Sequence, residues 1–286
     1  MDHSSQWSKS VALQRVRFLL DSAAMKYSPL VAPALLSALL LAGCQQSKQS
    51  EPPVVAQQKL ELGHHSATTA VPKSDAGWVK RFEQLSNNAA GFDGELIFIG
   101  DSITQGWEGG GKATWEKYFA KRGALNLGIS GDRTQHVLWR LANGNLEGIK
   151  PSRTGKRVAV IMIGTNNTGQ GGNPPVTNSA EEIADGIVGI VQSMRELQPD
   201  TKVLLLGVFP RSEAPGEMRD KIKSINGMAQ TVNDRRNIVY LDISEKFLAP
   251  NGYITKAVMP DFLHLSARGY EIWAEAIEPT LNEMLR

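Results

Sequence analysis

The sequence predicts an α/β fold in which helices cover both faces of a parallel sheet. Short apolar runs alternate with segments of helical periodicity over residues 76–286, and this alternation is typical of β-α-β units. Several runs are continuously apolar, as strands buried on both faces must be. No internal repeat or second core interrupts the alternation, so we expect one domain over residues 76–286.

Five apolar runs are expected to form the strands. They lie at residues 95–99 (ELIFI), 124–127, 158–163 (VAVIMI), 202–208 (KVLLLGV) and 237–241 (NIVYL). Segments of helical pattern lie at residues 113–122, 135–142, 180–197, 217–234 and 265–285. Because a helical segment separates each predicted strand from the next, the strands are expected to run parallel.

The N-terminal region departs from this pattern. Its apolar run at residues 30–42 (LVAPALLSALLLA) has the length of a signal-peptide core and is short for a membrane span. The run ends at Gly43-Cys44 and resembles the bacterial lipoprotein lipobox, which implies that Cys44 becomes the acylated first residue of the mature chain. We therefore expect residues 1–43 to be a signal peptide, with Met25 as an alternative start. A buried cysteine on a core helix is the other interpretation.

Residues 44–75 lack hydrophobic periodicity and are rich in Gln, Ser, Lys and Pro. This composition predicts a flexible tether between a membrane anchor and the folded domain. His64 and His65 lie in this stretch without a carboxylate or cysteine at ligand spacing. They are therefore interpreted as part of a solvated linker and not as a metal site.

Composition narrows the class of protein. The chain has 286 residues, of which 41% are hydrophobic and 21% charged, as expected for a globular protein with a sizeable core. Its formal net charge is only +2, and no basic stripe is interleaved with aromatic residues, so nucleic acid is not an expected partner. The single cysteine cannot form an internal disulfide, so the core must hold the fold.

Small and polar residues follow each of the first four strands. They are Gly100-Asp101-Ser102, residues 128–132 (GISGD), residues 164–167 (GTNN) and Phe209-Pro210-Arg211. Ligands of an open parallel sheet bind beyond the carboxyl ends of its strands. Each segment taken alone is also ordinary turn or helix-cap chemistry, so the prediction of a site rests on their combination.

The combination indicates a serine nucleophile. Ser102 needs a base to accept its proton, and histidine is the usual base when a carboxylate orients it. The predicted domain contains two histidines, His136 and His264. His136 lies within a helical pattern, whereas His264 lies in a loop three residues after Asp261. One turn can therefore point both side chains the same way, and the fold would have to bring this loop over Ser102.

An ester hydrolase also needs donors for the developing oxyanion. A backbone N–H at a tight glycine turn and a fixed side-chain amide serve this purpose. Gly131 and Asn166 are suitable, because each follows a strand that is expected to neighbour the first strand.

These blocks resemble the SGNH (GDSL-type) hydrolase family, and the order and spacing fit over residues 95–285. Gly100-Asp101-Ser102 matches the serine block, Gly131 the glycine block, Asn166 the asparagine block and residues 261–264 (DFLH) the Asp-x-x-His block. Within the family the chain is similar to the catalytic subunits of platelet-activating-factor acetylhydrolase. That likeness is carried by residues 132–141 (DRTQHVLWRL), 160–167 and 261–265 (DFLHL).

The resemblance implies a flavodoxin-like three-layer α/β/α sandwich with a five-stranded parallel sheet and without a metal or other cofactor. It implies that Ser102 is the nucleophile and His264 the base, oriented by Asp261. It also implies that the oxyanion donors are the N–H groups of Ser102 and Gly131 and the side-chain amide of Asn166. Ile103 and Leu263 are candidates for a small acyl pocket or, equally, packing residues.

The chain departs from those subunits in its leader and tether and in two Gly-rich segments, residues 106–112 and 169–178. We expect both segments to border the pocket, so substrate preference cannot be transferred. The first segment nearly matches a P-loop, but Ala113 stands where Ser or Thr would bind Mg²⁺, and the segment does not directly follow a strand. Ser130 resembles the nucleophile of an α/β-hydrolase elbow, but its closing glycine is one place early.

The sequence thus predicts a lipid-anchored serine ester hydrolase of the bacterial cell envelope. Its expected substrate is a small-molecule or polysaccharide ester, from which it removes acetyl or other short acyl groups. Phospholipid or lysophospholipid is the alternative substrate. An inactive glycan-binding module is the alternative from another class, and a metal-dependent hydrolase is disfavoured because no histidine cluster has ligand spacing.

Overall fold

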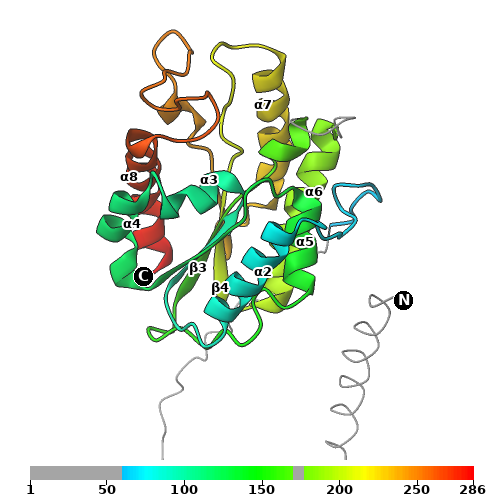
Figure 1. The fold of residues 1–286 in the computed structure, drawn as a ribbon, viewed down its shortest axis with the longest axis vertical. Coiled ribbons are helices and arrows are strands. Elements are labelled where there is room, and N and C mark those ends of the chain that lie inside the picture. The colour runs from blue at the N-terminus through cyan, green and yellow to red at the C-terminus, as the bar shows by residue number, and fades with distance from the viewer. Residues whose placement is uncertain (1–59, 170–176) are drawn as a thin grey trace, which may run out of the picture. The chain divides into compact units, whose positions relative to one another are not determined.

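The computed structural model describes residues 60–169 and 177–286 and has the predicted α/β architecture (Figure 1). The strands are β1 (Leu96–Gly100), β2 (Ala124–Gly128), β3 (Arg157–Met162), β4 (Thr201–Leu206) and β5 (Ile238–Leu241). All neighbouring strands pair in parallel, in the order β2-β1-β3-β4-β5. This is the flavodoxin-like order, and the chain direction across the sheet reverses between β1 and β3.

Helices flank the sheet on both sides. They are α2 (Ala76–Ala89), α3 (Ser102–Gln105), α4 (Lys112–Tyr118), α5 (Thr134–Ala142), α6 (Ala180–Leu197), α7 (Glu217–Ala229) and α8 (Ala267–Met284). Short 3₁₀ turns lie at Gly106–Glu108, Ala120–Arg122, Thr165–Thr168, Gln230–Val232 and Ser244–Phe247. Among the described helices, none is long and apolar enough to cross a membrane.

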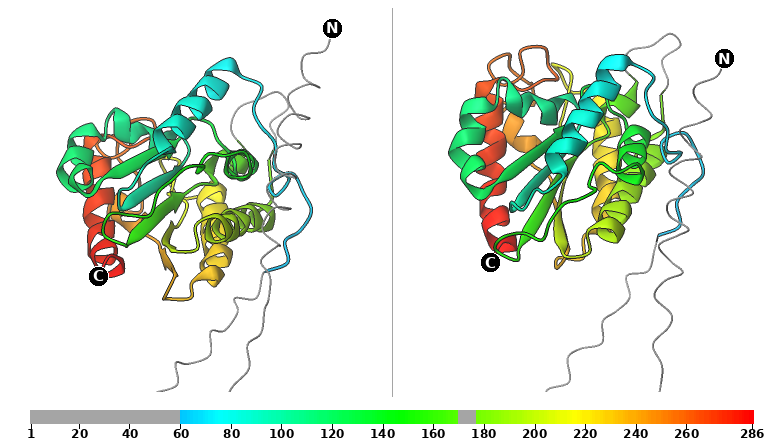
Figure 2. Two further views of the ribbon diagram at one scale, coloured as in Figure 1. Left: turned by 90° about the horizontal axis from the view of Figure 1, so that it is seen from below. Right: turned by 60° about the horizontal axis from the view of Figure 1, so that its bottom comes forward.

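The three layers follow from the alternation of side chains along each strand. In β1, Ile97 and Ile99 face a core shared with α2, α5, α6 and α7. Leu96 and Phe98 face the opposite core, which α4 and α8 cover with aromatic residues. Figure 2 shows α4 and α8 on one side of the sheet and α2, α5, α6 and α7 on the other. Burial of both strand faces explains why the apolar runs are continuous and not alternating.

Most predicted elements are confirmed, with differences at helix ends. The expected helix over residues 113–122 is α4 followed by a separate 3₁₀ turn, and the helix over residues 217–234 ends as α7 at Ala229 before another 3₁₀ turn. Helix α2 was not expected. Its first turn is capped by Asp75, whose side chain accepts a 2.8 Å hydrogen bond from the backbone N–H of Trp78.

Residues 60–75 form a strap that packs on the domain, although they were expected to belong to the flexible tether. Ala67 is fully buried, and its carbonyl accepts a 2.8 Å hydrogen bond from the Thr134 hydroxyl. The backbone N–H of Val71 donates to the carbonyl of Gln135 at 3.3 Å. We call residues 60–75 the N-terminal strap.

The strap also contacts α6. The Nε2 atom of His65 lies 3.2 Å from Oδ2 of Asp185, within hydrogen-bond distance, so His65 is not a solvated linker residue. The strap passes so close to this helix that a Cβ atom at Gly186 would lie 2.7 Å from the Ala67 carbonyl oxygen. One compact unit of the chain accordingly starts at Gln57, upstream of the expected boundary at residue 76. Cys44, the signal peptide and residues 44–59 of the expected tether lie outside the described residues.

Candidate active site

Ser102 lies just beyond the carboxyl end of β1. The turn that leads to it requires glycine at position 100. A Cβ atom at Gly100 would lie 2.1 Å from the Thr104 hydroxyl and 2.4 Å from a backbone oxygen of β3, so no other residue fits. Asp101 then caps α3 by accepting a 3.0 Å hydrogen bond from the Ile103 N–H. Ser102, the first residue of that helix, is partly exposed.

The loop before α8 places His264 against this serine. The Nε2 atom of His264 lies 2.9 Å from the Ser102 Oγ atom, and its Nδ1 atom lies 2.7 Å from Oδ2 of Asp261. The two loops are far apart in the sequence, and the fold brings them together as expected. The three predicted triad residues therefore form one continuous hydrogen-bonded series.

The turn of Asp261 and His264 is shaped by its own hydrogen bonds. The Oδ1 atom of Asp261 accepts from the backbone N–H groups of Leu263 at 3.1 Å and His264 at 2.7 Å. Phe262 has a φ of 59°, an uncommon conformation for a bulky residue. This single residue reverses the chain tightly enough for the carboxylate at position 261 to reach the imidazole at position 264.

The charge of Asp261 determines the tautomer of His264. Partial burial raises the pKa of Asp261, but hydrogen bonds from the imidazole and backbone of His264 outweigh it and lower the pKa below its usual value. An ionised carboxylate can only accept hydrogen bonds. The proton of a neutral imidazole therefore resides on Nδ1, and the lone pair of Nε2 faces Ser102.

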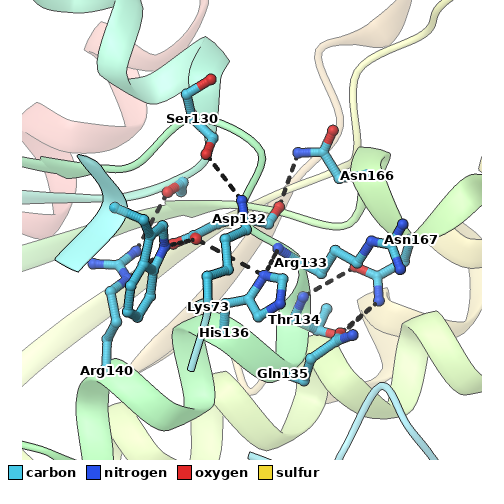
Figure 3. A network of polar contacts seen from close by, with 12 residues as sticks. Lys73, Ser130, Asp132, Arg133, Thr134, Gln135, His136, Arg140, Asn166 and Asn167 are labelled. Carbon is cyan, nitrogen blue, oxygen red and sulfur yellow. Dashed lines mark hydrogen bonds and ion pairs between the residues drawn. The ribbon is translucent and has the colours of Figure 1, made fainter. Parts of the chain in front are cut away.

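The glycine and asparagine blocks follow β2 and β3, the two strands that flank β1. Gly131 has a φ of 71° and so occupies the left-handed region that favours glycine. The side-chain amide of Asn166, on the 3₁₀ turn after β3, donates a 2.8 Å hydrogen bond to the backbone carbonyl of Asp132 (Figure 3). The two candidate oxyanion elements are thus joined directly.

A buried ion pair supports the glycine block from below. Asp132 and Arg140 are both fully buried, with Oδ2 and Nε 2.9 Å apart, and Trp78 Nε1 donates to Oδ1 of Asp132 at 2.6 Å. The same guanidinium donates to the carbonyl of Leu127 at 3.0 Å, at the end of β2. Arg140 therefore ties the loop after β2 to the end of that strand. Figure 3 shows this network beneath the loop.

His136 belongs to this supporting network and not to the triad. Its Nδ1 atom accepts a 3.0 Å hydrogen bond from the Arg133 N–H. Burial, together with the charges of Lys73, Arg133 and Arg140, lowers the pKa of His136 to about 3. The ring is therefore neutral at physiological pH and held in place as a helix-cap acceptor.

Asn167, next to Asn166, is fully buried and has a different set of partners. Its Oδ1 atom accepts from the Thr134 N–H at 3.0 Å, and its Nδ2 atom donates to Gln135 at 3.0 Å and to Asn178 at 3.1 Å. Asn167 therefore holds the start of α5 to the loop after β3. Asn166 thus lies at the candidate site, whereas Asn167 holds the loop that carries Asn166 in place.

The two candidate acyl-pocket residues have different environments. Ile103 is 1% exposed and packs in the aromatic core with Phe98 and Trp107, which favours its interpretation as a packing residue. Leu263 is partly buried against the same core. Ile103 also contributes its backbone, because its carbonyl accepts a 2.7 Å hydrogen bond from the Tyr270 hydroxyl.

The P-loop-like segment packs against Tyr270. A Cβ atom at Gly106 would lie 2.0 Å from the Tyr270 hydroxyl oxygen, and one at Gly111 would lie 2.8 Å from the Tyr270 ring. These glycines therefore make room for an aromatic side chain. The second glycine-rich segment lies largely in residues 170–176, outside the described part of the chain. Within the described part, no cluster of three or more His, Cys, Asp or Glu side chains could hold a metal ion.

Three supporting residues were missed by sequence reasoning: Lys73, Trp78 and Arg140. Arg140 lies on a helix, where an arginine is ordinarily read as exposed. Trp78 lies on the unexpected helix α2, and Lys73 lies in the presumed tether. Only the geometry of the folded chain reveals that all three converge on the loop after β2.

The sheet order is flavodoxin-like, and the assembled side chains at its carboxyl end are of the kinds found in ester hydrolases. The model of the GDSL-like lipase/acylhydrolase family matches residues 98–272. The rat platelet-activating factor acetylhydrolase IB subunit alpha2 is 35% identical over 214 residues, which cover 74% of this chain and 87% of that protein. The human subunit alpha1 is 34% identical, with coverage of 74% and 86%. The chain therefore belongs to the GDSL-like lipase/acylhydrolase family and is a carboxylic ester hydrolase.

Solved structures share the fold at lower identity. A GDSL-like lipase from Bacteroides thetaiotaomicron has a TM-score of 0.57 and 22% identity, covering 71% of this chain and 97% of that one. A catalytic mutant of an acetylxylan esterase from Geobacillus stearothermophilus has a TM-score of 0.51 and 20% identity, with coverage of 69% and 99%. Both similarities support the three-layer sandwich.

Proposed function

We propose that Ser102 is the nucleophile of this ester hydrolase, with His264 as general base and Asp261 as its orienting carboxylate. The observation that carries the proposal is the hydrogen-bonded series of 2.9 Å and 2.7 Å through these three side chains. Ser102 attacks the ester carbonyl while Nε2 of His264 accepts its proton. The imidazolium then protonates the leaving alcohol, and water repeats the cycle on the acyl-enzyme.

The proposed oxyanion donors are the N–H groups of Ser102 and Gly131 and the side-chain amide of Asn166. A side-chain amide has two N–H donors, and Asn166 gives one of them to the Asp132 carbonyl. The other remains for a ligand. Donors held before the substrate binds need no reorganisation as charge develops on the carbonyl oxygen.

We further propose acetyl or another short acyl group on a carbohydrate or similar ester as the group removed. The names of similar proteins support a short acyl group, because they include acetylhydrolase and acetylxylan esterase. Enzymes that catalyse the same reaction can differ in the loops that line the substrate pocket. The preference for acyl-chain length is therefore measured directly.

A panel of p-nitrophenyl esters with acyl chains from acetyl to dodecanoyl, together with acetylated xylan, tests this proposal. The expected result is the highest kcat/KM for acetyl and release of acetate from the polysaccharide. A maximum at the long chains would instead favour phospholipid or lysophospholipid as substrate. If no ester is hydrolysed and fluorophosphonate does not label Ser102, the result would favour a glycan-binding module.

The proposed location is the bacterial cell envelope, with Cys44 acylated and the domain on the outer side of the membrane that holds it. Its support is the apolar run at residues 30–42 followed by Gly43-Cys44. A lipid-anchored esterase would meet O-acylated polymers of the envelope, which agrees with the proposed substrate class.

A further inference from the structure

Lys73, on the N-terminal strap, lies directly against the glycine block. Its Nζ atom donates a 3.2 Å hydrogen bond to the backbone carbonyl of Ser130 (Figure 3). A Cβ atom at Gly131 would lie only 2.8 Å from the same Nζ atom. The ammonium group is therefore in contact with the peptide group that joins Ser130 to Gly131.

That peptide group has two ends with different partners. The carbonyl of Ser130 and the N–H of Gly131 belong to one planar unit and point in opposite directions when the bond is trans. Lys73 binds the carbonyl end, and the N–H end is the proposed oxyanion donor. The preceding peptide is also fixed, because the Ser130 N–H donates to the Gln105 side chain at 2.8 Å.

Lys73 is held in this place from both sides along the chain. Two residues earlier, the N–H of Val71 donates to the carbonyl of Gln135. Two residues later, Asp75 caps the first turn of α2. A lysine whose backbone is already held on both sides loses less backbone freedom when its side chain forms a contact than one on a free segment does.

Among the described residues, the ammonium group of Lys73 has no carboxylate within ion-pair distance. Partial burial lowers the pKa of Lys73, and the more distant Asp132 opposes this effect. Asp132 is itself paired with Arg140. Within the part of the chain that the structure describes, the one hydrogen bond of the Lys73 ammonium group is the bond to the Ser130 carbonyl.

We propose that Lys73 is a positioning residue for ester hydrolysis, which fixes and polarises the Ser130–Gly131 peptide group so that the Gly131 N–H becomes a stronger oxyanion donor. A charge-assisted hydrogen bond to the carbonyl end polarises the N–H end of the same unit. The inference rests on the proposed role of Gly131. It makes the strap part of the machinery that supports the reaction.

Three variants of the full chain test the inference with p-nitrophenyl acetate. Lys73→Met removes the charge, Lys73→Arg keeps it, and Lys80→Met is the matched control on the exposed face of α2. We expect Lys73→Met to lower kcat about tenfold with KM nearly unchanged, because only transition-state stabilisation is lost. Lys73→Arg should restore most of this loss, and Lys80→Met should resemble wild type. Melting temperatures of all variants should stay close to that of wild type.

The pH profile provides a second measurement. The charged groups that face Lys73 are Asp75 on the strap, Asp101 after β1, and Asp132 and Arg133 before α5. Partial burial lowers the pKa of Lys73, and burial raises the pKa of Asp101 to about 7. Asp101 is present in wild type and in Lys73→Arg alike, so a difference between their two profiles reports the proton of Lys73. Wild-type kcat should fall as Lys73 loses its proton, whereas Lys73→Arg should show no such fall, since guanidinium stays protonated.

Two outcomes overturn the inference. One is an unchanged kcat in Lys73→Met. The other is an equal loss in Lys73→Met and Lys73→Arg with a lowered melting temperature, which would assign Lys73 a packing role only. Ser102→Ala separates the inference from the proposed function. If Ser102→Ala is inactive while Lys73→Met resembles wild type, only the role of Lys73 is wrong, whereas an active Ser102→Ala would overturn the proposed nucleophile.

Discussion

The side-chain amide of Asn166 donates to the backbone carbonyl of Asp132 at 2.8 Å, and this bond joins the loops that follow β2 and β3. The nucleophile loop follows β1, which lies between those two strands. The elements expected to bind an oxyanion are therefore tied together across the strand that carries Ser102. A hydrogen bond within the protein holds this arrangement in place, as electrostatic preorganisation requires.

Replacement of Ser102 and of Ser130, the second serine in the loops of the site, should show which of the two is the nucleophile. Ser102→Ala should lower kcat by about 10⁴-fold or more, because removal of a triad serine leaves only binding and oxyanion stabilisation. Ser130→Ala is the matched control and should keep most of the activity, since Ser130 contributes its backbone N–H and carbonyl to the contacts described. Fluorophosphonate labelling checks the result independently. Labelling that persists in Ser102→Ala but not in Ser130→Ala would reverse the assignment.

Asp261→Asn should preserve the turn and impair the reaction. The asparagine Oδ1 atom can still accept from the backbone N–H groups of Leu263 and His264. Its amide, however, donates toward Nδ1 and favours the wrong tautomer of the imidazole, so kcat should fall by up to about 10⁴-fold. Asp93→Asn removes a carboxylate of an exposed ion pair and is the control. Activity of Asp261→Asn equal to that of the control would refute this role.

The adjacent asparagines should show opposite phenotypes. Asn166→Ala removes a proposed oxyanion donor, so kcat should fall by about 10²- to 10³-fold with a small change in melting temperature. Asn167→Ala leaves buried partners at the start of α5 unsatisfied, so its free energy of unfolding should fall by about 2 kcal/mol or more. Kinetics and urea denaturation of both variants measure the contrast. A stability loss in Asn166→Ala as large as that in Asn167→Ala would count against it.

The buried carboxyl group of Asp101 should make stability depend on pH. Burial raises the pKa of Asp101 from 3.8 to about 7. Between these values the folded state holds a proton that the unfolded state has lost. Stability should therefore fall as pH rises from about 4 to about 7, by on the order of 1 kcal/mol for each pH unit.

Asp101→Asn isolates this effect, because asparagine keeps the acceptor for the Ile103 N–H and does not titrate. The difference in free energy of unfolding between wild type and Asp101→Asn, measured with urea at pH 5 and pH 7, should move in favour of the variant at the higher pH. A difference that is the same at both pH values would show that Asp101 is ionised throughout.

The proposed membrane anchor predicts a modified N-terminus. Mass spectrometry of the protein from bacterial membrane fractions should find a peptide that begins at an acylated Cys44. Cys44→Ser should shift the protein out of those fractions, because the acyl attachment point is lost. Unmodified Cys44 in the membrane fraction would refute the lipoprotein interpretation.

Sequence reasoning was most successful where one physical signal dominates. Apolar runs located every strand, and those of β1 and β3 are continuous because both faces of these strands are buried. The triad could be predicted because few histidines and carboxylates combine at a spacing that suits one turn. Ser102, Asp261 and His264 indeed come together in the fold, although their catalytic roles stay predictions.

The supporting residues could not be predicted, because their roles depend on distant partners. Arg140 is fully buried only because Asp132 and the end of β2 receive it. Residues 60–75 have the composition of a tether, yet backbone and hydroxyl groups hold them on α5 and the Asp185 carboxylate holds them on α6. Hydrogen bonds of this kind leave no hydrophobic periodicity in the sequence.

Because the strap packs on the domain, the catalytic domain cannot be truncated at the start of α2 without loss of contacts. A fragment beginning at Ala76 would lose the acceptor of the buried Thr134 hydroxyl and the Ser66 partner of the Asn178 amide. It would also lose Lys73 and uncover α6 where Ala67 now packs. Fragments that keep the folding unit whole must begin before Leu60, well upstream of the residues that the family model matches.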